Sequence, residues 1–310
     1  MRFYFVSALA LSLALLSGCA TRAVQTETYL ASPPTDRPRQ VKIENVPFID
    51  QKIGHCGPAT LAMATAWAGR PIDVSELTKQ VYTPGAKGSF QADMIATARR
   101  NAFVAVPIRG LPALMTELAA GHPVIVFENL MLTWYPQWHY AVAFGYDLDN
   151  EDIILHSGSV KEKHWSLRKF ERSWMLGDYW GLVVLPPGVL AASADDLAHA
   201  SAALGLEQAG HASEAEKTYL SILEKWPTSL AALIGEANFE YARGHVKEAV
   251  TLLSTATGAH PEAAAAWHNL AIAQGEAGQT KQAKLSASKA MALVAGETKA
   301  SYSVSLKDWL

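Results

Sequence analysis

Cys56 is the residue whose type and position best suit chemistry. It lies in the stretch QKIGHCGPA, directly before a run of good helix formers that predicts a helix over 57–69, with Pro58 in its first turn. At a helix N-terminus, unpaired N–H groups and the helix dipole stabilise a thiolate, which is the nucleophilic form of cysteine. Gln51 lies on the loop that enters this helix, where its amide N–H can face a developing substrate oxyanion beside the Cys56 N–H.

His139 is the candidate base for this thiol. It follows Cys56 by 83 residues and begins the run HYAVAFGYD, whose alternation predicts a strand with His139, Ala141 and Ala143 on one face. A histidine at the start of a strand can reach over a helix N-terminus, accept the Cys56 proton and later protonate the leaving amine. The alternative reading of His139 is a structural histidine.

The elements that must position these residues mix helix and strand signals over 41–187. Periodicity, with Gly, Pro and Asn or Asp clusters as boundaries, predicts three helices and four strands in this region. The helices are expected over 57–69, 91–101 and 111–120, and the strands over 123–127, 139–146, 152–156 and 180–185. A linker is predicted over 188–195, after the Pro-Pro-Gly that ends the region.

From residue 196 the chain is Ala-rich and helical, and three residue types recur with a period of 34. Small residues let paired helices approach closely, glycine serves the turn between them, and proline ends the second helix. The repeated positions are Gly210, Gly244 and Gly278; Ala215, Ala249 and Ala283; and Pro227 and Pro261. This pattern resembles three tetratricopeptide repeats over 196–295, an all-α solenoid followed by a tail at 296–310; the alternative is an irregular helical bundle.

The motifs QKIGHCGPATLAMA and HYAVAFGYD together resemble the papain-like cysteine peptidases that process the double-glycine leaders of bacteriocins. The resemblance covers 41–187 and implies an α+β papain-like fold. It also implies Cys56 as nucleophile, His139 as base and Gln51 as the oxyanion-hole donor. The order of the segment Leu16-Ser17-Gly18-Cys19, which resembles a lipobox, then this domain and then helical repeats resembles a group of bacterial lipoproteins with such a domain.

The chain departs from that family at the third catalytic position. The family carries an Asp, followed by Pro, at the end of the strand after the histidine strand, whereas this sequence has Ser157 there, or His156 if the register slips by one. Asp147 is a poor substitute because eight extended residues place it about 26 Å from His139. Without a carboxylate the imidazolium is less stabilised, so the domain is either a slower enzyme or a binding module.

The N-terminal segment has the pattern of a secretory signal. Arg2 and an apolar stretch precede Leu16-Ser17-Gly18-Cys19, which resembles a bacterial lipobox: a signal peptide over 1–18, with Cys19 acylated. The following Ala20 implies, by the same resemblance, the outer membrane, with the protein facing the periplasm. Residues 19–40 are polar and Pro-rich and are expected to form a tether. The alternative is an ordinary signal peptide with an incidental cysteine.

Composition excludes several other classes. The 310 residues allow about two domains, and a net charge of −3 without a Lys/Arg block argues against nucleic acid as a partner. Two cysteines and the absence of His-Glu-x-x-His or phosphate-loop motifs predict no metal and no organic cofactor.

Aromatic residues are frequent around His139. Those before it, Trp134, Tyr135 and Trp138, suit the wall of a substrate groove. Those after it suit either a groove or the core, and they are Trp165, Trp174, Tyr179 and Trp180.

The sequence thus predicts a lipid-anchored envelope cysteine peptidase that acts on a peptide or protein, with a protein partner on the concave face of the repeats. A transferase acting through the same thiol is not separated from a hydrolase. The alternative function is a catalytically impaired binding module and repeat scaffold.

Overall fold

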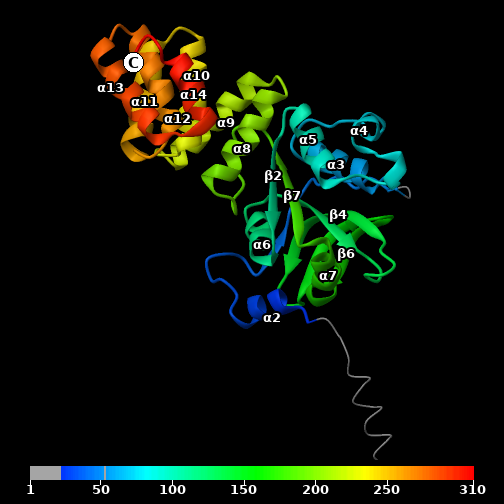
Figure 1. The fold of residues 1–310 in the computed structure, drawn as a ribbon. Coiled ribbons are helices and arrows are strands. Elements are labelled where there is room, and N and C mark those ends of the chain that lie inside the picture. The colour runs from blue at the N-terminus through cyan, green and yellow to red at the C-terminus, as the bar shows by residue number, and fades with distance from the viewer. Residues whose placement is uncertain (1–21, 52–53) are drawn as a thin grey trace, which may run out of the picture.

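The computed structural model describes residues 22–51 and 54–310 (Figure 1). The predicted signal peptide and the predicted acylation site Cys19 lie outside these ranges. Within them, no helix combines the length and the hydropathy needed to cross a bilayer.

The N-terminal half is built on an antiparallel seven-stranded sheet. Its strands run in the spatial order β2-β7-β3-β4-β5-β6, and β1, which is off this path, pairs with the last residues of β4. The strands are β1 (Gln40–Lys42), β2 (Val104–Arg109), β3 (Val124–Asn129), β4 (Trp138–Asp147), β5 (Asp152–Ser157), β6 (Val160–Ser166) and β7 (Trp180–Leu185). The four strands expected from the sequence are confirmed, and three are additional: β1, and the edge strands β2 and β6.

Two groups of helices cover the two faces of this sheet (Figure 1). On one face, α3 (Cys56–Trp67), α4 (Val74–Val81) and α5 (Gln91–Arg100) pack on alternate residues of the strands, including Ile125 and Val142. On the other face, α6 (Leu111–Ala119) and α7 (Leu167–Trp174) pack on the intervening residues. The structure confirms the expected helices α3, α5 and α6, so the domain is α+β as predicted.

The segment expected to be a tether differs from that expectation, because part of it is folded against the sheet domain. Helix α2 (Val24–Ala31) packs on α6 and α7, and the buried Glu171 of α7 accepts hydrogen bonds from the Gln25 and Thr26 N–H groups, at 2.9 and 2.6 Å. A carboxylate at a helix N-terminus satisfies donors that have no partner inside the helix. The sequence pattern alone does not reveal this contact, because the two partners lie 146 and 145 positions apart.

Three helix pairs follow, as the 34-residue period predicts. They are α8 (Asp196–Gln208) with α9 (Ala212–Lys225), α10 (Leu230–Ala242) with α11 (Val246–Ala259), and α12 (Ala264–Glu276) with α13 (Thr280–Leu293). Each pair turns at a glycine with positive φ, and the repeated alanines are fully buried. The predicted tail contains α14 (Gly296–Ser305), and Trp309 after it packs on Gly275.

The repeats are docked onto the sheet domain through a shared core. Buried residues of α8, α9 and α10 belong to the same apolar cluster as β2 and β7. The predicted linker is pinned, because the buried Glu117 of α6 accepts hydrogen bonds from the Ala192 and Ser193 N–H groups, at 3.1 and 2.6 Å. The first repeat therefore packs directly on the sheet domain.

Candidate active site

A cavity of about 840 Å³ opens where β4 begins and α3 begins, and it brings together residues far apart in the sequence. Its walls include Gln51, Cys56, His139 and Ser157, which were singled out from the sequence, together with Lys163. The segment before α5 adds Ser89 and Phe90 to the wall. The loop before β4 adds Gln137, and the first residue of β4 is Trp138, which also lines the cavity. His156 is absent from this wall.

Cys56 is the first residue of α3, so its sulfur lies at the helix N-terminus as expected. Burial raises the pKa of the Cys56 thiol, and hydrogen bonds from the N–H groups of Tyr140, Gly57 and Cys56 itself act in the opposite direction. The net direction is upward, so the unliganded site holds a neutral thiol. The helix terminus alone does not produce the thiolate that the sequence suggested.

Gly57 allows the close approach that shapes this wall of the cavity. A Cβ at this position would lie within 2.7 Å of the Ser89 Cβ and closer still to its hydroxyl oxygen. Any larger residue would therefore displace the segment that leads into α5.

His139 lies at the start of β4 and is half-buried. Its Nε2 is hydrogen-bonded to the Ser157 hydroxyl at 3.1 Å, which leaves Nδ1 for proton exchange. Burial lowers the pKa of His139 to about 4, and the positive charge of Lys163 acts in the same direction. At neutral pH the imidazole is therefore uncharged, the form that accepts a proton from a thiol.

Gln51 lines the cavity with an amide donor that has no partner among the described residues. The side-chain Oε1 of Gln51 accepts from the Gly158 N–H at 3.3 Å, and the backbone N–H of Gln51 donates to the Gly158 carbonyl oxygen at 3.4 Å. The remaining group, Nε2, is buried and has no hydrogen-bond partner in the part of the chain that the structure describes. A buried amide donor without a partner is costly unless a ligand completes it, as an oxyanion would.

Of the two candidates for the third position, Ser157 is the one that contacts His139. The His156 ring lies elsewhere: its Nε2 is hydrogen-bonded to the Val46 carbonyl oxygen at 3.2 Å, and its Nδ1 accepts from the Glu162 N–H at 3.2 Å. Among residues 22–51 and 54–310, no carboxylate is hydrogen-bonded to His139.

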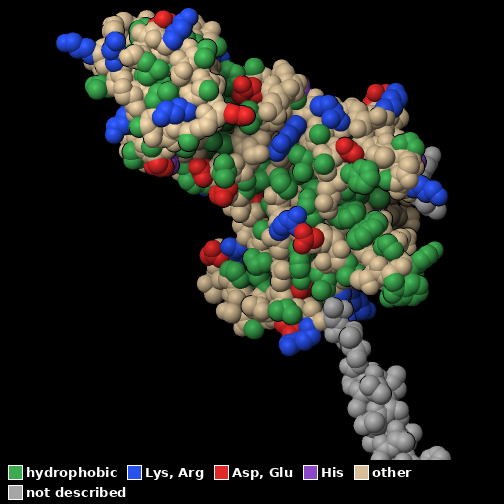
Figure 2. Space-filling model, viewed as in Figure 1, with side chains coloured by type: hydrophobic (Ala, Val, Ile, Leu, Met, Phe, Trp, Pro, Cys, Tyr) green, Lys and Arg blue, Asp and Glu red, His purple; other side chains and the backbone are tan. Residues whose placement is uncertain are grey.

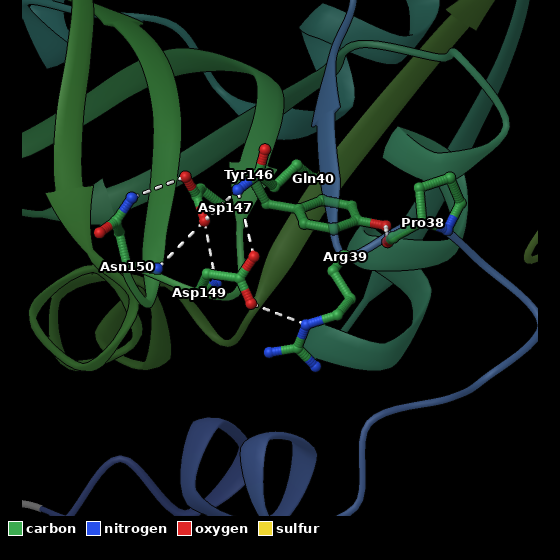
Figure 3. Close-up of polar contacts among 7 residues, drawn as sticks. All are labelled: Pro38, Arg39, Gln40, Tyr146, Asp147, Asp149 and Asn150. Carbon is green, nitrogen blue, oxygen red and sulfur yellow. Dashed lines mark hydrogen bonds and ion pairs between the residues drawn. The ribbon is translucent and has the colours of Figure 1, made fainter.

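Asp147 is committed to the turn between β4 and β5, as Figure 3 shows. Its Oδ1 accepts from the N–H groups of Asp149 and Asn150, at 2.9 and 3.0 Å, and its Oδ2 accepts from the Asn150 side chain at 2.8 Å. Gln40 donates to Asp147 from the entering strand β1. This carboxylate therefore stabilises the hairpin and does not serve His139.

The aromatic residues separate into two groups. Trp138 lines the cavity and stacks on Phe127 at 5.1 Å, whereas Trp134 and Tyr135 are 79% and 65% exposed and lie outside the cavity wall. Figure 2 shows hydrophobic side chains gathered on the surface over β4 and β6. Trp174 and Trp180 are buried in the core, so the alternative that these two line a substrate groove is wrong.

Sequence reasoning missed two charged residues near His139, namely Lys163 on β6 and Glu128 on β3. Lys163 lies in a polar segment, VKEKHWS, that does not read as a strand. Glu128 follows the apolar run PVIVF, and only the pairing of β3 with β4 shows that it stands directly opposite His139.

Comparison with known proteins agrees with this division of the chain. Residues 43–178 match the profile of the Peptidase_C39 like family, and residues 206–274 match a tetratricopeptide-repeat profile. The chain thus contains a Peptidase C39-like domain followed by a tetratricopeptide-repeat region, as the sequence motifs predicted. No curated protein sequence matches the chain significantly.

Three solved structures are similar to part of this chain. A double glycine motif protease from an AMS/PCAT transporter, solved with the leader peptide, is 19% identical, with 47% of this chain and 94% of that chain covered and a TM-score of 0.39. A putative C39-like peptidase from Bacillus anthracis is 20% identical (47% and 97% covered, TM-score 0.41). The peptidase domain of Streptococcus ComA, a bi-functional ABC transporter, is 21% identical (46% and 99% covered, TM-score 0.39).

Proposed function

We propose that this protein is a cysteine peptidase of the bacterial cell envelope, anchored by lipid at Cys19. In this proposal Cys56 is the nucleophile, His139 the general base and Gln51 the oxyanion donor. The observation that carries it is that one cavity holds all three side chains, with the buried Gln51 Nε2 lacking a partner among the described residues.

The protonation states support a mechanism that starts from a neutral pair. Burial disfavours both the Cys56 thiolate and the His139 imidazolium, so the proton moves from sulfur to imidazole as the thiol attacks the substrate carbonyl. The oxyanion that forms accepts hydrogen bonds from the Gln51 amide and the Cys56 N–H. The imidazolium then protonates the leaving amine, and water hydrolyses the thioester.

Peptide hydrolysis by the full chain tests this proposal. The wild-type protein, Cys56→Ala and His139→Asn are incubated with a mixture of synthetic peptides of varied sequence, and cleavage products are identified by mass spectrometry. We expect products only with the wild type and with the control variant His164→Ala, because that exposed histidine of β6 lies outside the cavity. Equal cleavage by Cys56→Ala and wild type would refute the proposal.

The repeats are proposed to hold a protein substrate or partner on their concave face, since stacked helix pairs supply a continuous binding surface without supplying chemistry. Their docking on α5 and β2 supports this role, because the surface is held at a fixed distance from the cavity. Deleting the repeats would expose the shared core, so surface substitutions on α10 and α12 are the suitable test. We expect them to weaken partner capture and leave cleavage of short peptides unchanged.

Lipid anchoring would hold the domain close to the outer membrane, facing the periplasm. Cys19 and the start of α2 at Val24 are separated by at most roughly 18 Å of extended chain. Mass spectrometry of the mature N-terminal peptide tests this proposal. We expect an acylated Cys19 in the outer-membrane fraction and a displaced, unacylated protein for Cys19→Ala; a free Cys19 would contradict it.

A second candidate function, a peptide-binding module without catalysis, is favoured by one observation. The His139 Nε2 has a serine hydroxyl and not a carboxylate as its partner, and a hydroxyl stabilises an imidazolium less. Alkylation of Cys56 as a function of pH separates the two. A reactivity at neutral pH that depends on His139, and so falls in His139→Asn, supports the peptidase, whereas the same profile in wild type and His139→Asn supports the binding module.

A further inference from the structure

Glu128 is a buried acid whose place in the fold is not explained by packing alone. It lies near the end of β3 and is 0% exposed. Its Oε2 accepts a hydrogen bond from the Ser173 hydroxyl at 2.6 Å, while Oε1 is buried without a partner in the described ranges. A carboxyl group kept in this state is costly, so an isolated structural role would favour an amide or an apolar residue here.

The register of the sheet places Glu128 directly opposite His139. The pairs Val124↔Ala143, Val126↔Ala141 and Glu128↔His139 follow one another along β3 and β4. The first two pairs belong to the core on the α6 and α7 side, so the third pair points to the same face. Directly opposed residues in an antiparallel pair have Cβ atoms about 5 Å apart, so the Glu128 and His139 side chains start from neighbouring points on one face of the sheet.

The charged groups around this pair come from a few elements. Lys163 of β6 is close enough for its charge to lower the pKa of both Glu128 and His139. Strand β7 and the turn Met175–Gly177 carry no ionisable side chain. On α7, the ionisable residues engage elsewhere or are exposed: Glu171 binds α2, Arg168 pairs with Glu151, and Lys169 and Arg172 are exposed.

We propose that Glu128 is the counter-ion of His139, a positioning residue whose ionised carboxylate stabilises the imidazolium formed when His139 takes the Cys56 proton. This inference rests on the proposed peptidase mechanism. The proton passes from the Cys56 sulfur to His139 and then to the leaving amine, and Glu128 exchanges no proton during the cycle. A carboxylate from β3 thus supplies the negative charge that Ser157 on β5 cannot supply.

The titration of Glu128 then controls the reactivity of Cys56. Burial raises the pKa of Glu128 to about 7, against the opposing effects of Ser173 and Lys163. At the pH near 4 where His139 alone would take a proton, Glu128 is still protonated and offers no charge. Above about pH 7, the imidazole faces an anion, and the thiolate–imidazolium pair becomes more populated.

Iodoacetamide alkylation of Cys56 between pH 5 and 8.5 tests this proposal. The full chain is used, and mass spectrometry of the Cys56 peptide distinguishes this thiol from Cys19. We expect wild type and Glu128→Gln to react at similar rates at pH 5, and the variant to react about tenfold more slowly at pH 8. The control Glu171→Gln removes another fully buried glutamate that does not face His139, and it should follow the wild-type curve.

Equal rates for wild type and Glu128→Gln at every pH would overturn the inference, provided that His139→Asn still slows alkylation. If His139→Asn also changes nothing, the Cys/His mechanism itself fails, so the two failures are distinguishable.

Ser173→Ala keeps the test decisive if Glu128→Gln does not fold. Removing the hydroxyl that lowers the pKa of Glu128 should move the rise in reactivity to higher pH. An unmoved rise would overturn the inference.

Discussion

The stability of the wild type is predicted to fall as pH rises through the titration of Glu128, and Glu128→Gln is predicted to remove this dependence. The folded-state pKa of Glu128 is about 7, above the ordinary value of 4.5, so the folded chain binds this proton more tightly than the unfolded chain does. The wild type therefore loses stability as pH rises from about 4.5 to 7. The difference of roughly 2.5 between these two pKa values corresponds to about 3 kcal/mol in the free energy of unfolding. The isosteric amide has no such penalty.

Glu117 provides a control of opposite sign. It is equally buried, and although burial alone would raise its pKa, hydrogen bonds from His122, Ser193 and the Ala192 N–H lower it below the ordinary value. Its ionised form contributes stability that is present above the unfolded pKa and is lost as pH falls through the folded pKa. Glu117→Gln should therefore be most destabilising at neutral pH, where Glu128→Gln is most stabilising relative to wild type.

Urea unfolding followed by tryptophan fluorescence at pH 4, 6 and 8 gives the comparison. We expect the free energy of unfolding of Glu128→Gln, relative to wild type, to increase by about 3 kcal/mol between pH 4 and 8. The same difference for Glu117→Gln should decrease. A difference for Glu128→Gln that stays constant over this range would refute the assignment of Glu128 as a strained, titrating acid.

Three further substitutions probe the cavity. Gln51→Ala should lower kcat about 10²–10³-fold in peptide hydrolysis with little change in KM, and a change in KM alone would argue against an oxyanion donor. Ser157→Asp should raise the pKa of His139 by about one unit or more, which NMR titration measures, and an unchanged titration would contradict the contact between residue 157 and His139. The same variant should increase the rate of Cys56 alkylation at neutral pH, which mass spectrometry measures. Gly57→Ala should reduce the free energy of unfolding by about 1–3 kcal/mol in urea titrations, and Ser89→Gly should restore part of it; no loss would show that the neighbouring segment adapts freely.

The sequence predicted the elements around the nucleophile because local signals there agree. Pro58 and the small residues after it favour a helix start, and alternation from His139 onward marks a buried strand. The edge strands escaped prediction for physical reasons. β2 contains Pro107, which is tolerated because the strand lies at the sheet edge. β6 is mostly polar, with Lys161, Glu162 and Lys163 in succession, and charged side chains are common on sheet edges.

Other features depend on contacts that no local pattern encodes. Helix α2 is stabilised by Glu171, which is far away in the sequence, so its polar residues read as a tether. The choice between Ser157 and His156 depends on which side of β5 each faces, and a slip of one residue reverses the answer. The position of Glu128 opposite His139 follows only from the pairing of β3 with β4, which the local sequence does not show.

The central claim, catalysis by Cys56 with His139, is tested most directly by comparing protein termini in the cell envelope. Cells that carry the wild type, Cys56→Ala or His139→Asn at equal levels are fractionated, and new peptide termini are quantified by mass spectrometry. We expect a set of termini that is present with the wild type and missing with both variants. An identical set of termini in all three strains would contradict it.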